Sequence, residues 1–78
     1  MKNPSGVKAF GIHLRRLRES KDISQQNLAD AADIAKITVQ RIENAKYSVT
    51  IDVLISIAGA LKITLSELMN FEPAKAKK

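Results

Sequence analysis

Four side chains that suit contacts with nucleic-acid bases share the outward face of a predicted helix of about three turns. They are Lys36, Ile37, Gln40 and Arg41. Arginine or lysine can donate to guanine O6 and N7, glutamine can pair with adenine, and isoleucine can contact a thymine methyl group. By periodicity alone an ordinary solvated helix face is the better interpretation, so the choice depends on how the rest of the chain positions this helix.

No arrangement of side chains predicts catalysis. The single histidine, His13, has no nucleophile or second ligand placed around it and lies on a polar helix face, so we expect it on the surface. The absence of cysteine removes disulfides and thiolate metal sites. The serines fall in predicted caps, loops or helix faces, and none is paired with a base. We therefore expect no enzyme activity, no cofactor and no bound metal.

The length and charge of the chain limit the class of protein it can be. The 78 residues allow one small domain, and no apolar run reaches the roughly 18–20 residues of a membrane span. We expect a soluble, cytoplasmic protein. The 13 Lys and Arg against eight Asp and Glu give a net charge of +5, which favours a polyanionic partner. A solvated tail carrying Lys75, Lys77 and Lys78 explains part of that charge equally well.

Hydrophobic periodicity and capping residues predict five short helices. The first spans about Val7 to Lys21, the second follows the N-cap Ser24, and Thr50 caps the fourth. The expected inner face of that fourth helix is formed by Ile51, Leu54, Ile57, Ala58 and Leu61. Thr64-Leu65-Ser66-Glu67 is a capping box that starts the fifth helix.

The expected fold class is therefore an all-α, compact five-helix domain. It spans residues 7–71, between a flexible N-terminus at 1–6 and a basic flexible tail at 72–78. Its second and third helices are joined by only a few residues around Asp33-Ile34-Ala35, a spacing that lets two helices cross steeply. This pair is a helix-turn-helix candidate, and its second member could enter the major groove, which is roughly 12 Å wide.

Several segments between residues 10 and 68 carry a resemblance to a known family by their order and spacing. They are Phe10-Gly11, Leu14 to Arg18, Ser24-Gln25 with Leu28-Ala29, Val39 to Glu43, and Ala58 to Leu61 with Thr64 to Leu68. Together they resemble the Cro and phage-repressor type helix-turn-helix family, often called the Xre family. The resemblance implies a lambda-repressor-like DNA-binding domain, often used as a two-fold dimer, whose third helix reads bases.

The resemblance also implies roles for single residues, through the family positions that they match. It implies that Lys36, Ile37, Gln40 and Arg41 read bases, which favours DNA binding over a solvated face. The positions that match phosphate contacts are Gln25, Thr38, Asn44, Lys46 and Tyr47. The resemblance also implies a structural ion pair between Arg18 and Glu43. For Arg15, Arg16 and Lys21 a solvated basic face remains the preferred interpretation.

The sequence departs from the family pattern at the places where helices end. The family usually has glycine at the positions of Asp22, Asp33, Ala45 and Lys62, a small hydroxyl residue at Ala35 and proline at Val49. Aspartate tolerates a left-handed backbone better than most residues, so Asp33 can still make the turn. Ala45 does so only at an energetic cost, and Ala35 has no side-chain atom that could cap the third helix.

The apolar residues left after the core faces are assigned suggest a thicker core or a subunit interface. They are Ile12, Val53, Ile55, Met69 and Phe71. We expect a homodimer through the fourth and fifth helices, with Val53, Ile55, Met69 and Phe71 as interface candidates. A two-fold pair doubles the contacts with DNA over half-sites roughly 34 Å apart.

The expected function is sequence-specific binding of double-stranded DNA, at an operator, by a transcriptional regulator that acts most simply as a repressor. A phage repressor, a controller of a restriction–modification operon and a DNA-binding antitoxin all fit a chain of this length. The alternative from another class is a protein-interaction module whose main, unidentified partner is a protein.

Overall fold

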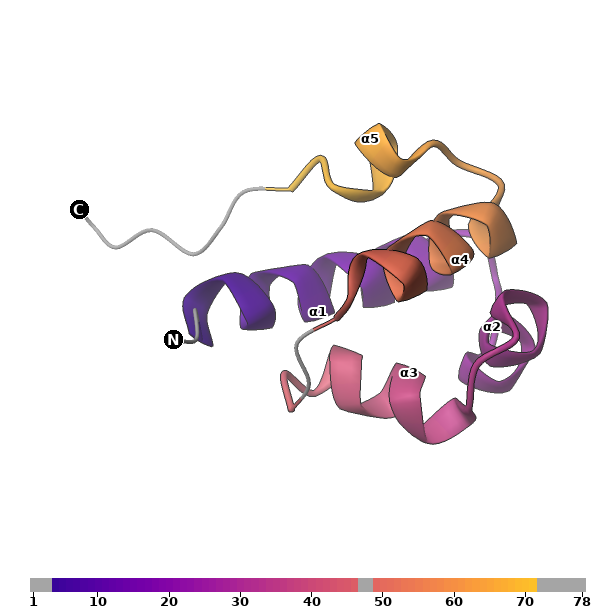
Figure 1. Ribbon diagram of the computed structural model, residues 1–78, viewed down its shortest axis with the longest axis horizontal. Coiled ribbons are helices and arrows are strands. Elements are labelled where there is room, and N and C mark those ends of the chain that lie inside the picture. The colour runs from indigo at the N-terminus through magenta and orange to yellow at the C-terminus, as the bar shows by residue number, and fades with distance from the viewer. Residues whose placement is uncertain (1–3, 47–48, 72–78) are drawn as a thin grey trace.

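Five helices make up the described part of the chain, residues 4–46 and 49–71 of the computed structural model. They are α1 (Pro4–Ser20), α2 (Gln25–Ala32), α3 (Lys36–Glu43), α4 (Ile51–Leu61) and α5 (Leu65–Leu68), and these residues contain no strand (Figure 1). The predicted all-α, five-helix fold is confirmed. α1 begins earlier than predicted, at Pro4, because proline is favourable at the first helical position, where its missing N–H has no helical partner to lose. The predicted tail at 72–78 lies outside the described residues.

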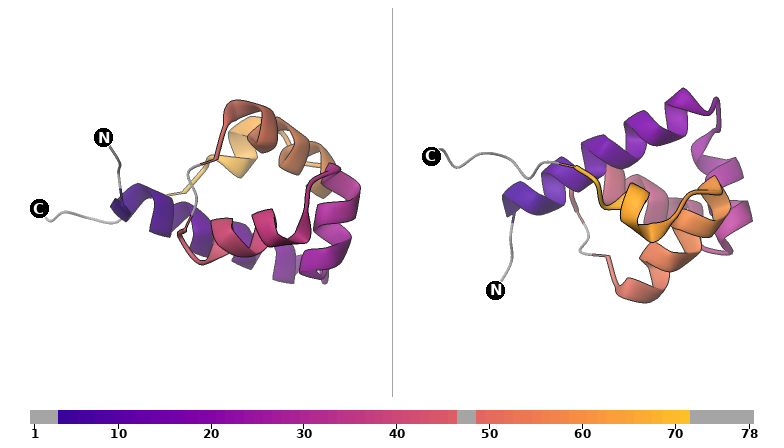
Figure 2. Two further views of the ribbon diagram at one scale, coloured as in Figure 1. Left: turned by 60° about the horizontal axis from the view of Figure 1, so that its bottom comes forward. Right: turned by 90° about the horizontal axis from the view of Figure 1, so that it is seen from above.

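The helices surround one core, with α3 at its edge. In Figure 1, α1 runs through the middle of the molecule, with α4 and α5 toward one side and α3 toward the other. α2 packs against both α3 and α4 and closes one end of the domain (Figure 2). α3 is thus held by α1 and α2, and one of its faces is left without a covering element. None of the described helices combines the length and apolarity needed to span a bilayer.

The core is almost entirely aliphatic. Its buried side chains are Phe10, Leu14, Leu28, Ala29, Ala32, Val39, Ile42, Leu54, Ile57, Ala58, Leu61 and Leu68. Four of the five residues predicted for the inner face of α4 are among them, but the prediction for Ile51 is wrong, because its side chain is 61% exposed. Ile51 is the first residue of α4, and among the described residues its side chain is left largely uncovered, whereas Leu54 in the same turn is buried.

Side-chain caps start three of the helices. The hydroxyl groups of Ser24 and Thr50 accept from backbone N–H groups in the first turns of α2 and α4, at 3.0 and 3.3 Å. Thr64 and Glu67 form the predicted capping box, in which each side chain accepts from the other residue's backbone N–H. α3 starts at Ala35 with no side-chain cap, as its methyl group requires.

The four longer helices end in the same way, with one residue in the left-handed conformation. These residues are Asp22, Asp33, Ala45 and Lys62, with φ between 59° and 61°. In each case the left-handed residue donates its N–H to the carbonyl three residues back, and the next residue donates to the carbonyl five residues back. This pair of bonds is the Schellman motif, for which glycine is the usual residue. The four positions where the family has glycine therefore keep the left-handed conformation without it.

Candidate nucleic-acid interface

The turn between α2 and α3 has a fixed geometry. Only residues 33–35 separate the two helices, and the N–H of Ile34 donates to the Ala29 carbonyl at 3.0 Å. The half-buried Ile34 side chain packs against the core. The Asp33 turn and the Ile34 anchor thus hold α3 across α2, as the helix-turn-helix arrangement requires.

The outward face of α3 carries the predicted base-reading residues. Val39 and Ile42 are buried, and the opposite face presents Lys36 and Arg41 to solvent. Ile37 is 50% exposed and adds an apolar group to this face. α3 forms the lower edge of the molecule in Figure 1, with no ribbon beyond it. Cationic and apolar side chains therefore lie together on a face that could approach a groove.

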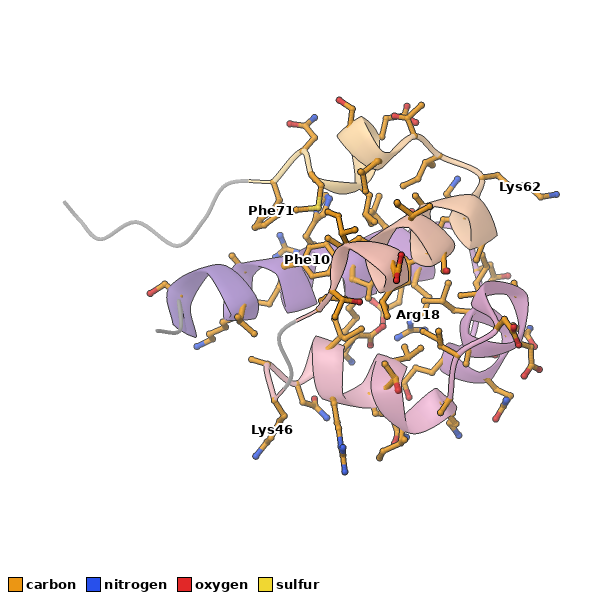
Figure 3. All side chains as sticks on the ribbon, in the orientation of Figure 1. Phe10, Arg18, Lys46, Lys62 and Phe71 are labelled. Atoms are coloured by element: carbon orange, nitrogen blue, oxygen red, sulfur yellow. The ribbon has the colours of Figure 1, made fainter. Side chains whose placement is uncertain are left out.

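Not all of the predicted DNA contacts are equally accessible. Gln40 and Thr38 are half-buried, so each presents only part of its side chain. Asn44 and Lys46, beyond the end of α3, are exposed, and Lys46 points away from the body of the molecule (Figure 3). Tyr47 lies outside the described residues.

Gln25 has a partner within the protein that the sequence did not indicate. Its Nε2 donates to Oε1 of Glu43 at 3.1 Å, so the side chain turns toward the end of α3. Because an amide nitrogen carries two hydrogens, the other N–H stays available for a phosphate. Gln25 is also the first residue of α2, whose unpaired backbone N–H groups favour an anion.

A shallow depression lies beside this helix start. Its volume is about 470 Å³, and its lining residues come from α1, the start of α2 and the start of α3. They are Arg15, Arg18, Ser24, Gln25, Gln26 and Lys36. Arg15, assigned above to a solvated face, therefore lies near Lys36 and the α2 N-terminus. The signal that could have shown this is its place one turn before Arg18 on α1.

Arg18 and Glu43 form a buried ion pair between α1 and the last residue of α3. Nε and Nη2 of Arg18 donate to the two carboxylate oxygens at 2.7 and 3.0 Å, and Nη1 donates to the Ile23 carbonyl at 2.8 Å. Only 10% of the Arg18 side chain and 3% of the Glu43 side chain are exposed. Hydrogen bonding to Glu43 raises the pKa of Arg18 above its ordinary value, against the opposing effect of burial.

The histidine expected on the surface is instead half-buried. The His13 ring stacks on Phe71 with centroids 5.4 Å apart, and Phe71 also contacts Phe10 at 5.5 Å (Figure 3). The buried Nε2 of His13 has no hydrogen-bond partner among the described residues. The surface prediction is wrong because Phe71, distant in sequence, covers this part of α1.

The four interface candidates fall into two pairs. Val53 and Phe71 are half-buried against the core. Ile55 and Met69 are 55% and 41% exposed. Ile51, on α4 one turn before Ile55, is also exposed.

Comparison with known proteins places this geometry in a family. Residues 14–68 match the helix-turn-helix family HTH_3. The control protein C.MunI of a Mycoplasma species is 40% identical over 62 residues, which are 78% of this chain and 84% of that protein.

Solved structures agree in fold. The restriction-modification controller protein C.AhdI from Aeromonas hydrophila superposes with a TM-score of 0.78 at 32% identity, over 80% of this chain and 94% of that one. The clp gene regulator ClgR from C. glutamicum gives a TM-score of 0.76 over 88% of this chain and 87% of that one, and its 22% identity shows the fold alone.

The match covers the helix-turn-helix and every helix packed against it, apart from the first part of α1. Members of the family are regulators of transcription rather than enzymes. The chain belongs to the HTH_3 helix-turn-helix family and is a DNA-binding transcriptional regulator.

Proposed function

We propose that the protein binds an operator in double-stranded DNA as a homodimer, with α3 of each subunit in the major groove, and that it regulates transcription from there in the cytoplasm. The observation that carries this proposal is the exposed face of α3, where Lys36, Ile37 and Arg41 stand together on a helix held by α1 and α2. Lys36 and Arg41 would donate to guanine, and Ile37 would contact a thymine methyl group.

Phosphate contacts would fix the register of α3 without reading sequence. The start of α2 supplies free N–H groups and the second N–H of Gln25, and Lys36 lines the same depression. Asn44 and Lys46, together with Thr38 and Tyr47, would contact the backbone near the other end of α3. DNA would thus be held at both ends of the helix that reads it.

The similarity to C.MunI and C.AhdI favours one biological role among the three that the sequence left open. We infer that the chain controls a restriction–modification operon. An isolated domain of this size contacts only a half-site, so a two-fold pair would join two half-sites. Ile51, Ile55 and Met69 provide exposed apolar surface on α4 and after α5 for that pairing.

Selection of bound duplexes from a random DNA library tests this function. We expect an enriched palindromic motif for the full chain. Lys36→Ala and Arg41→Ala should each lose about 1–3 kcal/mol of discrimination between bases, at particular positions of the motif. The matched control is Arg16→Ala, which removes the same charge from an exposed position on α1. It should weaken binding without changing the motif.

Two results would contradict the proposal. If no motif is enriched and the weak binding disappears as salt rises, the attraction is nonspecific, and docking of a protein partner becomes the better explanation. A monomeric mass at micromolar concentration, with and without the selected duplex, would count against the homodimer.

A further inference from the structure

Gly11 lies where α1 comes closest to the end of α3. A Cβ atom added to Gly11 would lie 2.5 Å from the carbonyl oxygen of Ile42 and 3.0 Å from that of Glu43. Non-bonded carbon contacts are most favourable at about 3.5–4.0 Å, so the Ile42 carbonyl would have to retreat by about 1 Å. The obstructing atoms belong to the backbone, and they can retreat only if the end of α3 moves with them.

The two carbonyl groups belong to the last two residues of α3. Immediately before them come Gln40 and Arg41, two of the residues proposed to read bases. Seven residues after Gly11 along the same helix, Arg18 holds the Glu43 side chain. The end of α3 therefore has two attachments to α1, one through backbone contact at Gly11 and one through the buried ion pair.

We propose that Gly11 is a positioning residue that sets how far the end of α3 stands out from the domain, and through this the discrimination of bases by Gln40 and Arg41. This inference rests on the proposed function of α3. A side chain at position 11 pushes the end of the helix outward, whereas Lys36 and Ile37, at the other end, stay anchored by the turn after α2. The displacement is therefore largest at the bases that Gln40 and Arg41 contact.

Gly59 provides a matched control within the chain. It is also a helical glycine, and a Cβ added there would meet no atom within 4 Å. Both Gly11→Ala and Gly59→Ala remove the flexibility of a helical glycine, but only the first meets a steric obstacle. Any difference between the two variants reports the contact with α3.

The experiment measures affinities for the selected operator and for each of its single-base variants. It uses full-length wild type, Gly59→Ala and Gly11→Ala, after circular dichroism has shown each to be folded at the temperature of measurement. For Gly11→Ala we expect a loss of about tenfold or more in discrimination at the bases that Arg41→Ala also relaxes, and nearly native discrimination at the bases that Lys36→Ala relaxes. The salt dependence should stay native, because no cation has been removed. Gly59→Ala should keep the native pattern.

Three outcomes would overturn the inference. One is a folded Gly11→Ala protein with native discrimination, even if it binds every duplex more weakly by the same factor. Another is an equal loss of discrimination at every base, which would mean that the substitution does not act at the end of α3. If Gly11→Ala does not fold alone, it is repeated in the Gly59→Ala background, where the second alanine favours the helix. Failure to fold there as well would show that Gly11 serves folding and not base discrimination.

The proposed function is tested separately by the same data. If Lys36→Ala and Arg41→Ala leave the operator preference unchanged, base reading by α3 is wrong. If they relax it and folded Gly11→Ala does not, only the role of Gly11 is wrong.

Discussion

The end of α3 and the ends of α1, α2 and α4 share a backbone motif but differ in the side chain that follows it. After the left-handed residue, α1, α2 and α4 continue with Ile23, Ile34 and Ile63, and all three isoleucines are half-buried against the core. α3 continues with Lys46, which is exposed. The Schellman motif usually includes an apolar contact at this position, so α3 alone of the four lacks it.

The difference shows how an exposed helix, here the one proposed to read DNA, can be kept in place. α1, α2 and α4 are each secured at their ends by a neighbouring apolar side chain. α3 is secured from a distance, by Arg18 and by close contact with Gly11. The residues that end α3 are thereby left free to carry polar side chains such as Lys46.

Removal of Arg18 should break this attachment with the largest effect. In Arg18→Ala the buried Glu43 carboxylate loses its charged partner, and we expect about 3–5 kcal/mol less stability. Chemical denaturation measures the change, with Arg15→Ala as control. Arg15 pairs with Glu19 at 3.1 Å on an exposed surface, where an ion pair contributes about 0–1 kcal/mol. Equal stability of the two variants would show that the buried pair does not hold α3.

The same pair predicts how stability depends on pH. Because the pKa of Arg18 is raised in the folded protein, its contribution is complete below the ordinary arginine pKa and is lost only as the pH rises through the raised value. We therefore expect the stability difference between wild type and Arg18→Ala not to fall as the pH is raised from about pH 8 to about pH 10. A decline of that difference within this range would mean that Arg18 loses its proton far earlier than the ion pair allows.

Relief of backbone strain at the end of α3 should have a smaller effect of opposite sign. Ala45 has φ of 60° and, unlike aspartate, has no polar side chain that favours this conformation. We expect Ala45→Gly to stabilise the protein by about 1 kcal/mol, which raises the Tm by roughly 4–8 °C in a domain of this size. Asp33→Gly, at a position where aspartate already tolerates the turn, is the control and should give less. A lower Tm for Ala45→Gly would contradict this account.

Replacement of Lys46, the residue after the left-handed turn of α3, should have the smallest effect on stability. It tests whether this position serves DNA binding without contributing to stability. Lys46→Ile gives α3 the residue that follows the turn in the other three helices. We expect no loss of stability, but weaker binding to all DNA sequences, with a salt slope smaller by about 1. Thermal unfolding and salt titrations of operator binding measure the two properties. Lys46→Gln is the control for loss of charge alone, and an unchanged slope in both variants would exclude a phosphate contact.

Much of the fold could be predicted because its signals are local. Ser24, Thr50 and Thr64 mark helix starts by their own hydroxyl groups, and the periodic apolar residues show which face of each helix is inward. The errors depend on long-range contacts. The pattern on α4 gives the direction of Ile51 but not whether another element covers it. The residues around His13 are polar, so they do not indicate that Phe71 packs on its ring.

The exposed face of α3, which is the candidate site, could also be predicted in part. The α3 face follows from periodicity and its proposed use from resemblance to a family. The bond from Gln25 to Glu43 and the closeness of Gly11 to α3 depend on how α1, α2 and α3 meet. These contacts could not be predicted from the spacing of residues along the chain.

The hydrogen bonds of Glu43 also lower the entropy cost of binding DNA. Its Oε1 accepts from both Arg18 of α1 and Gln25 of α2, so a single carboxylate of α3 joins three helices. The helix-turn-helix is therefore ordered before DNA arrives, and association need not fix its backbone. The remaining ordering falls on exposed side chains such as Lys46 and Arg41, at about 0.5–1.5 kcal/mol each. In the described part of the chain the helix-turn-helix can thus dock as a rigid body, and the remaining ordering falls on the exposed side chains proposed to contact DNA.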